Sequence, residues 1–182
     1  MVLKSLISLN DIKTMSPEKI VEIIATNLYS NYILNIRDPD TFYNLPGVIR
    51  DIILLIDFDT EVTMQGILGF LENSTGLYFK DTIKTFEKIQ AIEDYKILVK
   101  IESILKKYNI STSDLRKNVN DQGLYHINKF SKLHGPAYEN MAEEISSLAD
   151  SLYIYHDERN VFDLLTEYVC REKKFLIQEL EL

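Results

Sequence analysis

Apolar residues recur at helical spacing along most of this chain, and no stretch of useful length alternates apolar and polar residues as a strand does. The pattern is clear after Ser16-Pro17-Glu18, where Ile20, Ile24 and Leu28 fall on one face. A serine followed by proline and an early glutamate is typical of a helix start, because serine caps free amides and proline suits the first turn. The sequence therefore predicts an all-α fold.

The same periodicity predicts about six or seven helices. They form a compact single-domain bundle over residues 1–182, with residues 1–15 loosely packed. Besides the helix after Ser16, the pattern predicts helices from near Pro46 and over 77–92, 93–108, 136–155 and 157–180, with loops and a short helix in 109–135. A chain of 182 residues, 46% of them apolar, is large enough to bury a sizeable core.

Charge and cysteine content limit the function classes. The formal net charge is -8, which argues against general affinity for nucleic acid or an anionic membrane. Outside the N-terminal segment, which does not resemble a signal peptide, the longest apolar run is Ile52–Ile56. It is far shorter than the ~20 residues that span a bilayer. Cys170 is the only cysteine, so no intramolecular disulfide forms, and we expect a cytoplasmic protein.

No arrangement typical of catalysis or cofactor binding occurs in the sequence. His126, His134 and His156 lack ligand partners at helical spacing, and Cys170 stands alone. The glycine-rich stretch at residues 66–76, GILGFLENSTG, lacks the lysine and the order of a phosphate loop. We therefore predict no catalytic residue, no cofactor and no metal site.

Acidic residues are the remaining candidates for function. Asp57, Asp59 and Glu61 stand out because no base lies between Arg50 and Lys80. Such a run is most often a solvated helix end, and the alternative is an acidic recognition surface. The residues that we expect to contact a partner are all carboxylates: Asp57, Asp59, Glu61, Glu72, Asp157 and Glu158.

The stretch from Asp59 to Ala91, DTEVTMQGILGFLENSTGLYFKDTIKTFEKIQA, carries a resemblance. It is similar to the signature of a bacterial helical family named after a neisserial DNA-mimic protein. The residues that match the core of that signature are Val62, Gly66, Phe70, Asn73, Ser74 and Gly76. A second, weaker match is residues 146–169, SSLADSLYIYHDERNVFDLLTEYV.

This resemblance implies a compact all-α fold. For the founding protein it also implies a dimer whose surface carboxylates imitate DNA phosphates and occupy the DNA-binding face of a transcription regulator. We therefore expect a non-enzymatic acidic module that binds a basic protein, without direct nucleic-acid or membrane contact, and a homodimer as its state. Two alternatives stay open: an immunity-type protein that neutralises a toxin, and an enzyme with an unrecognised carboxylate site.

The glycine-rich stretch itself is expected to be an architectural corner. Gly66 would permit close helix approach, and Phe70 would anchor the core. Residues 73–76 would end one helix and start the next, with Gly76 in the left-handed conformation. A hydroxyl of Ser74 or Thr75 would cap the helix that begins at Leu77.

Overall fold

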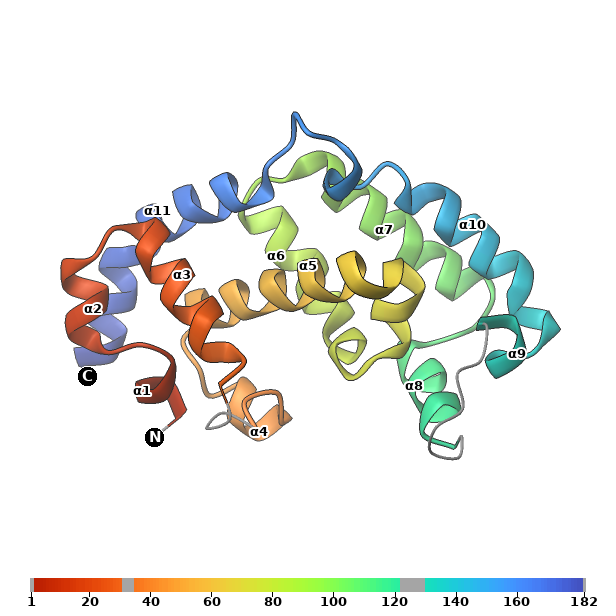
Figure 1. The fold of residues 1–182 in the computed structure, drawn as a ribbon, viewed down its shortest axis with the longest axis horizontal. Helices are drawn as coiled ribbons and strands as arrows, with labels where there is room; N and C mark the ends of the chain where they lie inside the picture. Colours follow the sequence, from red (N-terminus) through yellow and green to blue (C-terminus); the bar gives the residue numbers. More distant parts are fainter. Residues whose placement is uncertain (1, 31–34, 122–129, 182) are drawn as a thin grey trace. The chain divides into compact units, whose positions relative to one another are not determined.

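The computed structural model describes residues 2–30, 35–121 and 130–181, and these residues form helices without any strand (Figure 1). The predicted all-α class is confirmed. The predicted number of helices is too low, because eleven α-helices occur in this part of the chain. Seven of them have seven or more residues, so periodicity found the long helices and missed those of one or two turns.

The chain divides into two compact units, which we describe separately. Residues 1–56 and 160–182 form the first unit, and residues 57–159 form the second. The helices of the first unit are α1 (Val2–Leu6), α2 (Leu9–Thr14), α3 (Pro17–Leu28), α4 (Pro39–Phe42), the beginning of α5 (Gly47–Glu72) and α11 (Val161–Glu181). The expectation of a single domain stays a prediction.

In the first unit, α3 packs against α11, α1 packs against α3, and α2 packs against α11. The Ser16 hydroxyl caps α3 by accepting a hydrogen bond from the Lys19 amide, as predicted. Leu6 and Ile12, from the first fifteen residues, are fully buried. The Tyr168 hydroxyl donates a 2.6 Å hydrogen bond to the carboxylate of the buried Asp51, and burial raises the pKa of Tyr168.

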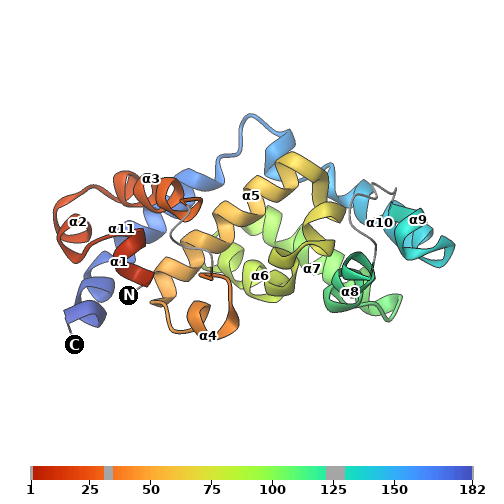
Figure 2. The same cartoon turned by 60° about the horizontal axis from the view of Figure 1, so that its bottom comes forward.

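The second unit contains the rest of α5 and the elements up to residue 159. These are η1 (Ser74–Tyr78), α6 (Phe79–Lys88), α7 (Ile92–Lys107), α8 (Thr112–Asn120), α9 (Phe130–His134), η2 (Pro136–Tyr138), α10 (Glu139–Ala149) and η3 (Tyr153–Tyr155). Figures 1 and 2 show α6 beside α7, and α10 also packs against α7. No helix in the described part of the chain is both long and apolar enough to cross a membrane.

Aromatic side chains form the core of the second unit. Phe58 and Phe70 are essentially fully buried, and their ring centroids lie 5.0 Å apart in an edge-to-face arrangement. Phe58 makes a similar contact with Phe86 at 5.1 Å, and Phe79 contacts Phe70 at 6.0 Å. The prediction that Phe70 anchors the core is confirmed.

The predicted roles of the two glycines are wrong. Gly66, not Gly76, has positive φ: its angles of 72° and 176° interrupt α5, and a Cβ there would meet nothing within 4 Å. This backbone region is accessible essentially only to glycine. Gly76 is the position of close approach, because a Cβ there would meet the Phe70 carbonyl and lie 2.7 Å from the Leu71 carbonyl oxygen.

The corner after α5 also differs from the expected capped helix start. Asn73 and Ser74 do end one helix and start the next, but the next helix is the 3-10 turn η1, and α6 begins only at Phe79. No side chain caps η1 or α6. The Thr75 hydroxyl is buried and has no hydrogen-bond partner among the described residues, so the predicted cap is absent.

Candidate acidic protein-binding surface

The predicted carboxylates of α5 make their contacts mainly within the second unit. Asp57 is buried, with 6% of its surface exposed. Asp59 accepts a 2.7 Å hydrogen bond from the Tyr153 hydroxyl. Burial, followed by the negative charge of Asp59, raises the pKa of Tyr153, so the phenol stays a donor. Asp59 therefore fastens η3 to α5.

Glu61 and Glu72 are also held by internal hydrogen bonds. Asn73 donates to Glu61 across 2.5 Å, which ties the end of α5 to an earlier turn of the same helix. Glu72 Oε2 lies 2.9 Å from Nε2 of the buried His134, whose Nδ1 lies 3.1 Å from the Asn118 side-chain nitrogen. Asn73, a residue of the family signature, thus holds the Glu61 carboxylate in place.

Asp157 and Glu158 are the two predicted contact residues that are exposed. They lie in the turn between η3 and α11, where Glu158 Oε1 is 3.5 Å from His156 Nδ1. The six predicted residues therefore fall into two groups. Four carboxylates of α5 are buried or half-buried, and two in a turn are open to solvent.

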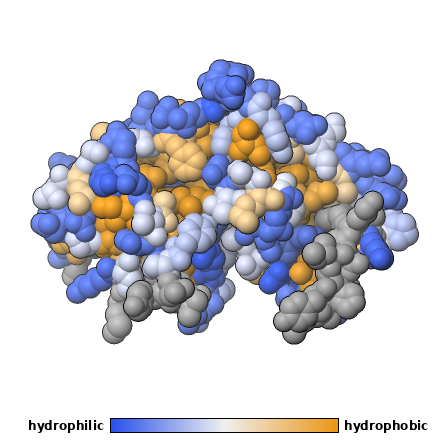
Figure 3. Space-filling view, in the orientation of Figure 1, coloured by the Kyte–Doolittle hydropathy of each residue, from blue (hydrophilic) through white to orange (hydrophobic). Residues whose placement is uncertain are grey.

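A row of exposed carboxylates on α10 escaped the sequence prediction. The row consists of Glu139, Glu143 and Asp150, the residue that ends the helix. At about 100° per residue the three positions lie within about 40° of one another around the helix axis. They lie opposite Met141 and Ile145, which are fully buried. We call Glu139, Glu143 and Asp150 the α10 row, and Figure 3 shows hydrophilic residues over this helix.

The α10 row is free of neutralising partners in the described chain. No ion pair or side-chain hydrogen bond joins these three carboxylates to a described residue. The sequence indicates this lack of neutralising partners, because residues 133–158 contain six acids and neither lysine nor arginine. The signal was missed because the acids are spaced along a helix rather than gathered in one run.

Two sets of internal contacts hold the α10 region in place. The carboxylate of Glu144 accepts hydrogen bonds from Lys107 at 2.7 Å and from the Tyr108 hydroxyl at 2.6 Å. These bonds lower the pKa of Glu144 and fasten α10 to the end of α7. The α10 row therefore lies on a helix whose middle is fixed to the end of α7.

The segment after α10 is fastened through Asp94. This residue is buried, and its carboxylate accepts a 2.8 Å hydrogen bond from the Tyr153 amide. Arg159 lies 3.6 Å from Asp94 and 3.1 Å from Glu93, and it also donates to the Ser151 carbonyl. Burial raises the pKa of Asp94, although the Tyr153 amide and Arg159 act in the opposite direction.

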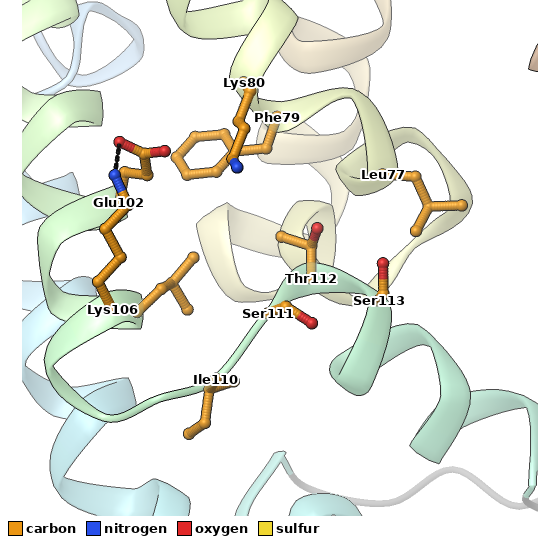
Figure 4. A pocket seen from close by; sticks show the side chains of 10 residues that line it. Leu77, Phe79, Lys80, Glu102, Lys106, Ile110, Ser111, Thr112 and Ser113 are labelled. Carbon is orange, nitrogen blue, oxygen red and sulfur yellow. Dashed lines mark hydrogen bonds and ion pairs between the residues drawn. The ribbon is translucent and has the colours of Figure 1, made fainter.

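A hollow of about 310 Å³ lies where α6, α7 and the start of α8 meet (Figure 4). Its carboxylate, Glu102, forms a 2.7 Å ion pair with Lys106, drawn as a dashed line. Lys80 extends into the same space, and Leu77 and Phe79 supply apolar walls. This hollow has more positive than negative charge, so it does not belong to the acidic surface.

A second hollow, of about 380 Å³, pairs its acids with bases. Glu93 forms an ion pair with Arg159 there, and Glu158 lies beside His156. Lys96 and Lys100 complete the charged lining. Neither hollow brings unpaired carboxylates together as the enzymatic alternative requires. Within the described residues no three His, Cys, Asp or Glu side chains form a group that would hold a metal ion. His126 lies outside those residues.

Comparison with known proteins places these features in a family. Neither the curated proteins nor the solved structures include a match to this chain. The family model described as DMP19-like protein matches residues 43–173, which include all of α5 to α10 and the glycine-rich stretch. This match covers well over half of the chain and contains every residue of the α10 row. The chain belongs to the DMP19-like protein family.

Proposed function

We propose that this protein is a non-enzymatic acidic module that binds a basic DNA-binding protein and competes with DNA for it. The observation that carries the proposal is the α10 row, three exposed carboxylates on one face of a helix without a described ion-pair partner. Membership in the DMP19-like family supports DNA mimicry as the mode of action.

The spacing of the α10 row suits a DNA-binding face. At 1.5 Å per residue, Glu139 and Glu143 lie about 6 Å apart along the axis, and Glu143 and Asp150 lie roughly 10 Å apart. Phosphates along one DNA strand recur about every 3.4 Å of axis, so the row spans the length of about five phosphates. Arginine and lysine side chains that bind phosphates also form charge-assisted hydrogen bonds with carboxylates.

The acidic excess of the second unit lies in two segments of its sequence, one of which contains α10. Residues 57–79 and 133–158 together contain ten acids and no lysine or arginine, whereas residues 80–132 contain eleven bases and seven acids. The exposed carboxylates of the segment that contains α10 would attract a basic protein. Long-range attraction of this kind speeds association and weakens as salt is added.

The experiment compares capture of host proteins by three immobilised full-length chains. They are the wild type, Glu139→Gln/Glu143→Gln/Asp150→Asn, and the control Asp163→Asn/Glu167→Gln/Glu179→Gln, which removes three exposed carboxylates from α11. Both variants change the net charge equally. We expect a DNA-binding protein that the wild type and the control retain and the α10 variant loses.

Purified partner is then mixed with duplex DNA and this protein. Competition predicts that increasing DNA releases the protein from its partner. A ternary complex, or equal retention by both triple variants, would contradict the proposal. Capture of a toxin in place of a DNA-binding protein would favour the immunity-type alternative.

A further inference from the structure

A small pocket lies between the second half of α5 and the end of α10. It has a volume of about 150 Å³, and its lining includes Gly66, Ser146, Ala149, Asp150 and Tyr155. Pockets for drug-sized ligands are larger, about 300–1,000 Å³. This pocket therefore suits a single side chain of a partner rather than a free organic ligand. One of its walls is Asp150, the last carboxylate of the α10 row.

Tyr155 is unusual among the exposed tyrosines. Tyr29, Tyr43 and Tyr155 each have slightly more than half of their surface exposed. Arg37 lies over the Tyr29 ring at 5.6 Å, and Arg50 lies over the Tyr43 ring at 5.8 Å. No described cation lies over the ring of Tyr155. An arginine from another molecule would give Tyr155 the contact that the other two already have.

The pocket belongs to the part of the chain that lacks bases. Its α5 wall comes from residues 65–68 and its other wall from residues 146–155, and both stretches lie within base-free segments. Gly66 shapes the α5 wall, because its positive φ turns the helix there. The space that a Cβ would occupy at Gly66 is open. The family signature therefore contributes directly to this pocket.

We propose that this pocket receives an arginine side chain of the basic partner, stacked on Tyr155 and hydrogen-bonded to Asp150. This inference rests on the proposed function and names the chemistry that the partner presents. Arginine fits better than lysine, because its flat guanidinium stacks on an aromatic ring while its several N–H groups reach a carboxylate. Lysine offers a compact charge without that plane.

The probes are hexa-arginine and hexa-lysine peptides, which carry equal charge, titrated into the full-length protein by calorimetry at one fixed salt concentration. We expect the wild type to bind hexa-arginine about five- to tenfold more tightly than hexa-lysine. One exposed stacking contact with its hydrogen bond contributes about this factor to affinity. Tyr155→Leu keeps an apolar side chain and should remove this preference. The matched control Tyr43→Leu changes a tyrosine that Arg50 already covers, and it should keep the preference.

Equal affinity for the two peptides, or an arginine preference that survives in Tyr155→Leu, would overturn the inference, as would the absence of binding. The double variant Glu139→Gln/Glu143→Gln separates this result from the proposed function. If the wild type binds both peptides equally and the variant binds both more weakly, the arginine pocket is wrong and the acidic surface stands. If the variant binds both peptides like the wild type, the α10 row itself loses its support.

Discussion

The predicted carboxylates of α5 and the carboxylates of the α10 row lie in equally base-free sequence, yet their roles differ. In α5, Asp59, Glu61 and Glu72 accept hydrogen bonds from Tyr153, Asn73 and His134. In α10, the three residues of the α10 row have no described partner. A run of acids without bases therefore does not identify a binding surface. What decides is whether donors from other parts of the chain reach those acids after folding.

The largest expected effect is on binding by the α10 row. Glu139→Gln/Glu143→Gln/Asp150→Asn should weaken binding of the basic partner about 100-fold or more, since hydrogen bonds between charged groups contribute about 1.5–3 kcal/mol each. The free energy of unfolding should change by less than about 0.5 kcal/mol, because the three side chains are exposed. Calorimetric titration and urea denaturation measure the two quantities. A large loss of stability would mean that the row is structural, like the α5 carboxylates.

Tyr153→Phe tests whether the hydrogen bond to Asp59 of α5 stabilises the fold. It removes the hydroxyl that donates to Asp59, and it should lower the free energy of unfolding by about 1.5–3 kcal/mol, the range for a hydrogen bond to a charged group. Tyr155→Phe, two residues along the chain, serves as the control with an exposed ring and should change stability little. Equal unfolding midpoints in urea for both variants would show that the Asp59 bond is not structural.

Gly76→Ala examines the corner that follows Glu72 and Asn73. A Cβ at this position would press on the carbonyls of Phe70 and Leu71, so we expect a loss of about 1–3 kcal/mol in unfolding free energy. Gly47→Ala is the control, because the nearest atom to its added Cβ lies 3.9 Å away, at ordinary contact distance. Thermal and urea unfolding of both variants provide the measurement. An unchanged Gly76→Ala protein would refute the close approach.

The buried Asp94 predicts a pH effect of defined sign. Burial raises its pKa, so the folded state holds the proton more tightly than the unfolded chain does. The stability contributed by this proton is complete below the ordinary pKa of about 3.9 and is lost as pH rises through the raised pKa. Asp94→Asn, which retains an acceptor for the Tyr153 amide, should therefore gain stability relative to the wild type as pH rises from about 4. A difference that stays constant with pH in urea denaturation would contradict this.

The smallest effect is expected for the turn residues. Asp157→Asn/Glu158→Gln removes two exposed charges outside any helix, so stability should change by less than about 0.5 kcal/mol. Partner binding should weaken severalfold, mainly through slower association at low salt, since charges at the edge of an interface act on the rate of encounter. Stopped-flow association at two salt concentrations measures this. An effect as large as that of the α10 row would move the centre of the surface to this turn.

Local features predicted much of the fold. Ser16 and Pro17 mark the start of α3 because a cap depends on neighbouring residues alone. The region 109–135 was expected to contain loops and a short helix, and α8 and α9 occur within its described part. Helices as short as α4, with four residues, present too little periodicity to detect. The candidate site was less predictable, because exposure of a carboxylate depends on residues that are distant in the sequence.

The sequence by itself determined the helical class, the base-free acidic segments and the signature of the family, since periodicity, charge and motif spacing are local properties. Only the tertiary structure decided which carboxylates face solvent, because Tyr153, Asn73 and His134 reach the α5 acids through folding. It also decided that Gly66 turns the backbone and Gly76 admits a close contact. A glycine is compatible with either role, and the choice depends on the φ angle and on the atoms that pack against it.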